Sequence, residues 1–365
     1  MRNRWLWVLV TGAVLLVLAV VIPCLAPAGE VYSVAHYKVL SAIRHDNLSI
    51  FPVIAATTHD TEGFLTLDEG LRSGEVVVSE SGSLSPLVRP RRGESPTPRN
   101  YPGAQVNQLV LVNNSRRPLI LLAGEIVTGG HQDRVIGKDR LVPAESDPID
   151  LGVFCVEPGR WTGPKATFGS IGSPMGAPAL RAKVMADKDQ QKVWAEVRSS
   201  QASVAAQLRA PSAVAVNGTS SYAGVMQNEE VKEKVDSIAA PIQRDYQSLI
   251  KQLRDRQAVG VVVAVNGEIV WADIFASTSL LEKYWPKLVR SYAAEAIVNR
   301  ARNNSVDLRA AQQFLDDLEG RRETVETEPG LYRHTEVSGD GFKAFELTSL
   351  LPKTGFDLHV AKMAE

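Results

Sequence analysis

Residues 259–275 read Val-Gly-Val-Val-Val-Ala-Val-Asn-Gly-Glu-Ile-Val-Trp-Ala-Asp-Ile-Phe, two apolar runs separated by one Asn-Gly pair. Asn266 and Gly267 can supply the positive φ angles of a type I′ turn, and β-branched residues are frequent on either side. The stretch therefore predicts a β-hairpin with strands at 259–265 and 268–275. It also predicts a sheet in the second half of the chain.

Apolar residues recur every three or four positions on both sides of the hairpin, which is typical of helices that pack along one face. Long helices are expected at 179–208 and 228–257, and Pro241 within the second predicts either a kink or two joined helices. After the hairpin, Ser279 and Glu282 fit a capping box that starts a further helix. The remaining elements expected in this half are a short helix at 308–318 and strands at 331–337, 342–348 and 357–361.

Short strand-like segments dominate the first half of the chain. The run Pro118–Ala123 is apolar on both faces, which predicts a central strand. The other elements expected here are strands at 48–55, 75–79, 106–112, 134–142 and 151–156, with one helical turn at 67–71. The two halves together predict an α+β fold, with a β-rich N-terminal half and with long helices, a β-hairpin and further strands in the C-terminal half.

The N-terminal residues have the composition of a secretion signal. Arg2 and Arg4 precede an uncharged run over 5–22, and Ala26-Pro27-Ala28 offers a small-residue cleavage site before Gly29. The run has 18 residues, just long enough to cross a bilayer, so an uncleaved membrane anchor is the alternative. Both interpretations export the rest of the chain across the cytoplasmic membrane, where it would be periplasmic or secreted.

Length and composition limit the class of protein. The chain has 365 residues, of which 44% are hydrophobic, and this excludes a disordered or collagen-like chain. With 1–28 set apart as signal peptide or anchor, 29–365 is expected to form one domain, with a possible division into a β-rich part at 31–163 and an α+β part at 178–365. The 40 Lys and Arg residues balance 41 Asp and Glu residues, so the basic surplus of a non-specific nucleic-acid binder is missing.

Cysteine and histidine usage bears on disulfides and metals. Cys24 precedes the expected cleavage site, so cleavage would leave Cys155 without a partner for an internal disulfide. Cys155 is either a nucleophilic thiol or a small buried residue in a strand, and burial is the favoured interpretation. The six histidines do not have the spacing of metal ligands, so no metal site is predicted, and no cofactor is identified.

Polar groups are concentrated in one segment between apolar strands, Gly124-Glu-Ile-Val-Thr-Gly-Gly-His-Gln-Asp-Arg134. Paired glycines let backbone N–H groups approach a ligand, while an aspartate can exchange protons and an arginine can clamp an anion. The alternative is a tight turn in which Asp133 and Arg134 pair with one another. The residues expected to function here are Glu125 and Asp133 as catalytic groups and Gly129, Gly130, Gln132 and Arg134 as ligand-binding residues.

A second polar segment follows about twenty residues later, Cys155-Val-Glu-Pro-Gly-Arg-Trp161. Trp161 could stack on a sugar or base, and Arg160 could bind negative charge. The alternative is that Trp161 fills the core while Glu157 and Arg160 form a surface ion pair of little energetic value. Because both segments end apolar strands, we expect them to meet at one edge of the sheet. Glu157 is then a third catalytic group, and Arg160 and Trp161 are further ligand-binding residues.

Taken as one pattern, Gly-Glu-x-x-x-Gly-Gly-x-Gln-Asp-Arg followed by Cys-Val-Glu-x-Gly-Arg-Trp resembles the ARG and rhodanese-phosphatase-superfamily-associated protein domain family, in which ARG means ADP-ribosylglycohydrolase. The resemblance runs from about Ser41 to His359, is strong over Leu109–Trp161, and departs at Pro158, where a polar residue is expected. It covers Glu125, Gly129, Gly130, Gln132, Asp133, Arg134, Cys155, Glu157, Gly159, Arg160 and Trp161. The family name implies a link to ADP-ribose or phosphoester metabolism and no particular activity.

Two functions remain open at this point. The first is an exported domain with a small-molecule site for a phosphorylated or sugar-containing ligand, ADP-ribose-like by family association; hydrolysis there would use Asp133 or a glutamate as general base. The second is a non-catalytic module of the cell envelope that binds or meets a partner. In both, the membrane is involved only through the N-terminal segment, and no nucleic acid is bound.

Overall fold

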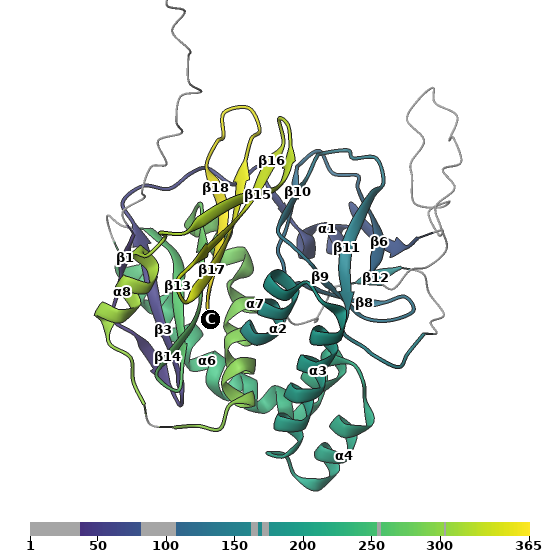
Figure 1. Cartoon of the computed structure of the whole chain (residues 1–365), viewed down its shortest axis with the longest axis vertical. Coiled ribbons are helices and arrows are strands. Elements are labelled where there is room, and N and C mark those ends of the chain that lie inside the picture. Colours follow the sequence, from purple (N-terminus) through teal and green to yellow (C-terminus); the bar gives the residue numbers. More distant parts are fainter. Residues whose placement is uncertain (1–36, 82–106, 162–166, 170–174, 254–256, 303) are drawn as a thin grey trace, which may run out of the picture. The chain divides into compact units, whose positions relative to one another are not determined.

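The computed structural model describes residues 37–81, 107–161, 167–169, 175–253, 257–302 and 304–365 (Figure 1). The predicted leader at 1–28, with the anchor alternative at 5–22, lies outside these residues. Residues 36–365 cluster into one compact unit. Within the described part of the chain, no helix combines the length and the apolar character needed to cross a bilayer.

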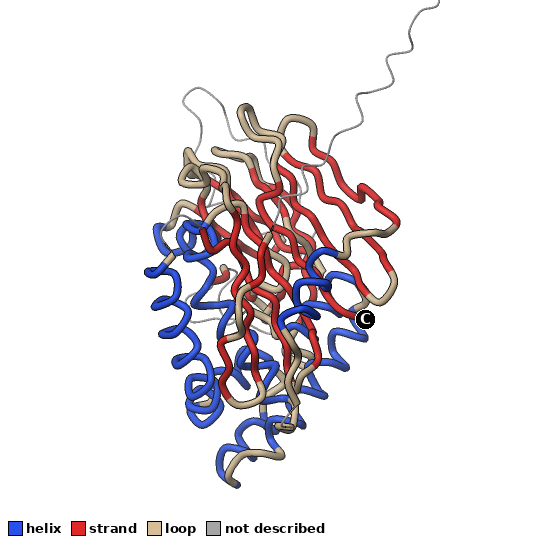
Figure 2. Tube along the Cα trace, turned by 90° about the vertical axis from the view of Figure 1, so that its left-hand side faces the viewer, coloured by secondary structure: helices blue, strands red, loops and turns tan. Residues whose placement is uncertain are grey.

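The order of elements confirms the α+β fold, with a β-rich first half and with helices, a hairpin and further strands in the second (Figure 2). The first-half strands are β1 (Lys38–Val39), β2 (Ile43–His45), β3 (Leu48–Ala55), β4 (Leu65–Thr66), β5 (Val76–Glu80), β6 (Gln108–Asn113), β7 (Leu119–Leu121), β8 (Ile126–Gly129), β9 (Arg134–Ile136), β10 (Arg140–Val142), β11 (Ile149–Cys155) and β12 (Phe168–Gly169). The second-half strands are β13 (Gln257–Val265), β14 (Glu268–Phe275), β15 (Arg321–Glu328), β16 (Tyr332–Gly339), β17 (Phe342–Ser349) and β18 (Asp357–Ala364). The helices are α1 (Leu67–Ser73), α2 (Pro178–Ala182), the π-helix η1 (Lys183–Asp187), α3 (Gln190–Ala205), α4 (Ala210–Gly218), α5 (Tyr222–Gln227), α6 (Glu229–Gln252), α7 (Thr278–Val298) and α8 (Leu308–Asp316).

Nine strands form one antiparallel sheet in the order β1-β3-β13-β14-β18-β17-β16-β15, with β2 paired to β3 (Figure 1). Strand β3 comes from the first half of the chain and lies between β1 and β13, and all eight of its residues are buried. Successive side chains of a strand point to opposite faces. Ile50 accordingly packs in the core that contains α6 and α7, whereas Phe51 packs in the core that contains α8. This part of the sheet is therefore buried on both faces.

The hairpin predicted from 259–275 lies in the interior of this sheet. β13 and β14 pair antiparallel, with Val265 opposite Glu268 across the turn. Asn266 and Gly267 have φ angles of 55° and 81°, the left-handed pair that a type I′ turn requires. The predicted hairpin is confirmed, and the positive φ angles of these two residues allow a two-residue turn to connect its strands.

The first half supplies two smaller sheets, β10-β7-β4 and β12-β8-β9-β11-β6-β5. The strand predicted to be central, β7, is the middle strand of its sheet. The single strand expected at 134–142 is wrong, because β9 and β10 belong to different sheets. Asp139 lies between these two strands and belongs to neither. Its carboxylate accepts a hydrogen bond from the backbone N–H of Ala123 at 2.7 Å.

The long helix expected at 179–208 is wrong in its continuity. The chain forms α2, then η1, and then a separate α3. Lys188 has a φ of 53°, which ends the first part, and Asp189 begins α3 by accepting the backbone N–H groups of Gln191 and Lys192. An aspartate that caps a new helix thus interrupts a stretch whose composition favours one continuous helix.

Two further helices differ from the prediction in detail. α6 is one helix through Pro241, so the alternative of two joined helices is wrong. α7 begins after Ser277, whose side chain accepts the backbone N–H of Leu280, so the capping box expected at Ser279 and Glu282 is wrong. Two serines two residues apart both fit a helix start, and the pattern alone does not distinguish them.

Strand β15 has no counterpart among the predicted strands. Its sequence, Arg-Arg-Glu-Thr-Val-Glu-Thr-Glu, is charged and mostly exposed, so it lacks the apolar alternation that marks a strand. β15 pairs with β16 at the end of the nine-stranded sheet. Charged side chains are common on such an edge, where they discourage pairing with another chain.

Candidate functional site

The two polar segments lie side by side because the strands that carry them pair antiparallel. Cys155 of β11 is opposite Arg134 of β9. Residues that follow Cys155 therefore run beside residues that precede Arg134. The backbone N–H of Val156 donates to the carbonyl oxygen of Asp133 at 3.1 Å, and Glu157 comes to lie next to Asp133.

Glu157 ties the two segments together. Its carboxylate accepts the backbone N–H of Asp133, and its carbonyl oxygen accepts Nε2 of Gln132, both at 3.0 Å. Arg160 donates Nε and Nη2 to the two carboxylate oxygens at 2.7 and 2.6 Å, a bidentate pair. The pair of Glu157 and Arg160 considered as the alternative does form, but around a buried carboxylate rather than on the surface.

Asp133 is held by three neighbours. Its Oδ1 accepts the backbone N–H of Gly129 at 3.1 Å and lies 3.5 Å from Nη2 of Arg160. Its Oδ2 accepts the Ser221 hydroxyl at 2.7 Å. Burial has the largest influence on this carboxyl and raises the pKa of Asp133 above its usual value, while the Ser221 hydrogen bond acts in the opposite direction. We call Asp133, Glu157, Arg160 and Ser221 the carboxylate clamp.

Gly129 and Gly130 form the turn that the clamp holds. Their φ angles are 128° and 49°, and a side chain at Gly130 would collide with Phe168 and with the carboxylate of Glu80. Their carbonyl oxygens accept hydrogen bonds from Arg160 at 3.4 and 3.1 Å. The glycines thus allow the turn to fold against Arg160, and a direct role in ligand binding stays a prediction for them and for Gln132.

Arg134 is buried, with 0% of its surface exposed. Its Nη1 reaches the carbonyl oxygen of Asp133 at 3.5 Å, while Nε and Nη2 have no hydrogen-bond partner among the described residues. The alternative in which the Asp133 and Arg134 side chains pair is therefore wrong. Burial outweighs the nearby negative charges, including that of Glu80, and lowers the pKa of the Arg134 guanidinium. A buried cation without such partners is the kind of group that a ligand can stabilise.

The Trp161 indole lies over Arg134. Its ring centre is 5.8 Å from Cζ of Arg134 and 5.3 Å from the centre of the His131 ring, which is tilted by 34° to it. Trp161 is 44% exposed, so the alternative that it fills the core is wrong. An exposed indole beside an imidazole can stack on the face of a sugar or a base.

Glu80 belongs to the same group of residues and is not among the predicted ones. It ends β5 and is 1% exposed; its Oε1 accepts the backbone N–H of His131 at 2.7 Å, and its Oε2 has no hydrogen-bond partner among the described residues. The signal in the sequence is a glutamate at the end of an apolar run. Nothing in the sequence indicates that this run ends beside the glycine turn. We call Glu80, His131, Arg134 and Trp161 the open polar group.

Glu125 lies apart from the carboxylate clamp. Its carboxylate is buried, accepts the backbone N–H of Leu122 at 2.9 Å and lies 3.2 Å from Nζ of Lys287. Burial is the main cause that raises the pKa of Glu125 to about 7, and Lys287 opposes it. Among the contacts that the structure describes, none joins Glu125 to Asp133 or Glu157, so the three predicted catalytic groups do not form one cluster.

Cys155 is buried within β11, as the favoured interpretation expects. Its Sγ accepts the backbone N–H of Glu157 at 3.4 Å, and burial raises the pKa of the thiol. A thiol that stays protonated and out of solvent is a poor nucleophile. The described contacts therefore give Cys155 a packing role.

A second group of charges, which the sequence does not predict, lies inside the fold. Nδ1 of His359 is 2.5 Å from Oδ2 of Asp139, and Nε2 is 3.0 Å from Oδ1 of Asp273. Asp273 also accepts two hydrogen bonds from Arg181, both at 2.7 Å, and one from the Tyr292 hydroxyl at 2.5 Å. Burial lowers the pKa of His359, but the two carboxylates outweigh it and raise that pKa to about 9. We call these five residues the core network.

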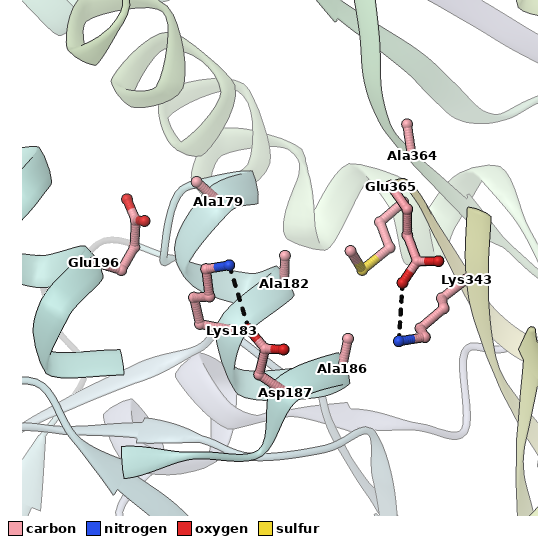
Figure 3. A pocket seen from close by; sticks show the side chains of 10 residues that line it. Ala179, Ala182, Lys183, Ala186, Asp187, Glu196, Lys343, Ala364 and Glu365 are labelled. Atoms are coloured by element: carbon pink, nitrogen blue, oxygen red, sulfur yellow. Dashed lines mark ion pairs between the residues drawn. The ribbon is translucent and has the colours of Figure 1, made fainter. Parts of the chain in front are cut away.

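Two hollows among the described residues lie elsewhere. One has a volume of about 360 Å³ and is bordered by the ion pairs Lys183–Asp187 and Lys343–Glu365 (Figure 3). The other has a volume of about 530 Å³ and is lined by residues 58–60 and 352–356. Neither is lined by a residue of the carboxylate clamp or the open polar group. Among all residues that the structure describes, no three His, Cys, Asp or Glu side chains are grouped so that they could hold a metal ion.

The family model of the ARG and Rhodanese-Phosphatase-superfamily-associated Protein domain matches residues 36–361. The chain belongs to this family. The resemblance expected from the two polar segments is thereby confirmed, and the family domain takes in both of them and nearly all of the compact unit. The family name associates the domain with ADP-ribose-related systems and states no reaction. A comparison with curated proteins and with solved structures finds no match.

Proposed function

We propose that the domain binds a phosphorylated, sugar-containing small molecule at the open polar group. The observation that supports this most directly is the buried guanidinium of Arg134, two of whose nitrogens lack a hydrogen-bond partner among the described residues. A buried polar group left unpaired destabilises a fold by about 1–3 kcal/mol, and by more when it is charged. A ligand that accepts these two hydrogen bonds removes that penalty, so the site is prepared for one.

The aromatic side chains beside Arg134 support the same proposal. Trp161 is 44% exposed and its ring lies against that of His131. Rings of this kind bind the apolar face of a sugar or the plane of a base, and they leave the polar edge of the ligand free for hydrogen bonds. A ligand with both parts, such as ADP-ribose, agrees with the family association.

We assign the carboxylate clamp a supporting role rather than a catalytic one. Each of the four carboxylate oxygens of Asp133 and Glu157 accepts a hydrogen bond from within the protein. A general base needs an oxygen that is available to a bound water or hydroxyl. The geometry therefore supports binding better than hydrolysis, and the clamp's contribution is the shape of the glycine turn.

A ligand screen with one matched pair of variants tests the proposal. The full chain is melted with ADP-ribose, ribose 5-phosphate and UDP-N-acetylglucosamine, and a ligand at a hundred times its Kd adds about 2.7 kcal/mol of apparent stability. Arg134→Met should abolish the shift. Arg117→Met should keep it, because Arg117 is a partly exposed arginine of the same β-rich half. The proposal fails if none of the three compounds stabilises the wild-type chain, or if Arg134→Met responds as the wild type does.

We also propose that the domain works outside the cytoplasmic membrane. The support is the order of charged, apolar and small residues over 1–28. Mass spectrometry of protein from a cell-envelope fraction should find cleavage after Ala28, whereas the anchor alternative leaves an intact N-terminus in the membrane fraction. An intact N-terminus in the cytosolic fraction would contradict both.

A further inference from the structure

The open polar group contains one positive and one negative side chain, and both are buried. Arg134 offers two N–H donors without a partner, and Glu80 offers the acceptor Oε2. Contacts connect the two side chains: Oε1 of Glu80 lies 2.7 Å from the backbone nitrogen and 3.2 Å from Nδ1 of His131, the His131 ring lies against Trp161, and Trp161 lies over Arg134. The charge of Glu80 also acts on the Arg134 guanidinium. Their formal charges cancel, so the interior of this group is neutral and can both donate and accept hydrogen bonds.

Because the two charges cancel, the hydroxyl groups of a phosphorylated sugar suit this pair of side chains better than its phosphate does. A phosphate bound to Arg134 would bring its negative charges beside the buried carboxylate of Glu80, and like charges repel strongly where water is excluded. Two neighbouring hydroxyl groups carry no charge. They can donate hydrogen bonds to Oε2 of Glu80 and accept hydrogen bonds from Arg134. The hydroxyl pair can form hydrogen bonds with both Glu80 and Arg134. A phosphate can form them with Arg134, but it is repelled by Glu80.

We propose that Glu80 and Arg134 together bind two neighbouring hydroxyl groups of the ligand's sugar, while its phosphate stays on the solvent side of Trp161. The inference rests on the proposed function and narrows its ligand to sugars with a vicinal diol. It makes Glu80 the residue that determines specificity, although neither polar segment of the sequence contains it.

The exposed Trp161 indole covers Arg134, one member of this pair. Arg134 has no exposed surface, and the indole lies over its guanidinium at 5.8 Å. We expect a sugar to enter between the indole and the guanidinium, so that the sugar ring stacks on Trp161. Binding should thus change the indole's surroundings and its fluorescence, and this change should be missing in Trp161→Phe.

Calorimetry with three probes tests the inference on the full chain: ribose 5-phosphate, 2-deoxyribose 5-phosphate and inorganic phosphate. Wild-type protein should bind ribose 5-phosphate at least about tenfold more tightly than either of the others, because a lost hydrogen bond to a charged group weakens binding by that factor or more. Glu80→Gln should weaken ribose 5-phosphate by about tenfold and 2-deoxyribose 5-phosphate by no more than about twofold. Glu75→Gln, the same change at a partly exposed site just before β5, should alter neither.

The outcomes separate this inference from the proposed function. Equal affinity for the two sugar phosphates, or inorganic phosphate binding as tightly as ribose 5-phosphate, overturns the diol and leaves a phosphate-binding site in place. No binding of any probe overturns both. If Glu80→Gln does not fold, as judged by circular dichroism, the ranking of the three probes on wild-type protein still decides, because it involves no variant.

Discussion

The core network and the open polar group each bury an arginine and a carboxylate, and they use them differently. Arg181 and Asp273 share two hydrogen bonds of 2.7 Å. Arg134 and Glu80 are as deeply buried, but Nε and Nη2 of Arg134 and Oε2 of Glu80 have no hydrogen-bond partner among the described residues, whereas Arg181 leaves only its Nε without one. Paired charges hold together the elements that carry them. Unpaired charges add nothing to the fold and become favourable only when something else binds them.

The two groups also differ in where they lie. The core network joins β14, β18, α2 and α7, which are central elements of the fold. The open polar group lies at the end of β5, in the turn between β8 and β9 and at the start of β9, and it includes the half-exposed indole of Trp161. Burial alone therefore does not distinguish the two groups, whereas the hydrogen bonds made by their charged side chains do.

Removing the arginine of the core network should destabilise the fold more than any of the other substitutions. Arg181→Met leaves Asp273 buried with His359 and Tyr292 alone, so the free energy of unfolding should fall by about 3–5 kcal/mol. Urea denaturation followed by circular dichroism measures it. Arg117→Met, at a partly exposed site, should change stability by no more than about 0.5 kcal/mol. A loss of less than about 1 kcal/mol in Arg181→Met would mean that this network does not hold the fold together.

A pH titration tests the contribution of His359 to the core network. The pKa of His359 is raised from 6.5 to about 9, so its contribution to stability is complete below pH 6.5 and is lost as the pH rises through 9. Lys362, whose pKa burial lowers to about 8, acts in the opposite direction in this window, so the contribution of His359 is measured as a difference. Between pH 7 and pH 9 the wild-type protein should lose roughly 2 kcal/mol relative to a variant without His359. Glu125, whose raised pKa is about 7, acts mainly below this window, because its contribution fades as the pH rises from 4.5 to 7.

His359→Gln is the control for that titration. Its stability should be lower than that of the wild type at pH 7, but it should not fall from pH 7 to pH 9, since no histidine is left to lose its proton from the network and Lys362 acts in the other direction. A variant that keeps the wild-type slope would assign the pH dependence to another group.

The smallest effect is expected at the open polar group. Arg134→Met removes a buried cation that has few partners, so the free energy of unfolding without ligand should stay within about 1 kcal/mol of the wild type or rise. The same urea titration, run beside Arg181→Met, measures the contrast. If both arginine variants are equally destabilised, the distinction between the two groups is lost.

Local chemistry made parts of the fold predictable. Asn266 and Gly267 define their own turn, and β-branched runs on either side define its strands, so the hairpin needs no distant information. The meeting of the two polar segments was also predictable, because both end apolar strands. The identity of the paired atoms was not, since it depends on the register of Cys155 opposite Arg134.

Other parts depend on contacts that leave no mark in a short stretch of sequence. Glu80 meets the glycine turn only through the order of strands in its sheet, and His359 meets Asp139 across 220 residues. Glu125 and Asp133 belong to the same sequence motif, which suggested a shared site. In the fold the Glu125 carboxylate instead contacts Leu122 and Lys287. Asp189 interrupts a predicted helix because capping outweighs propensity there.

Strand β3 makes the folding of this domain depend on a segment far along the chain. It is paired with β13, and residues such as Leu48 and Val265 that face each other are more than 200 positions apart in the chain. Closing so long a loop is slow, and until β13 is in place the apolar side chains of β3 have no partner strand on that side. An unfolded chain therefore exposes a strand whose eight residues are all buried in the fold, and we expect it to be prone to aggregation until that loop closes.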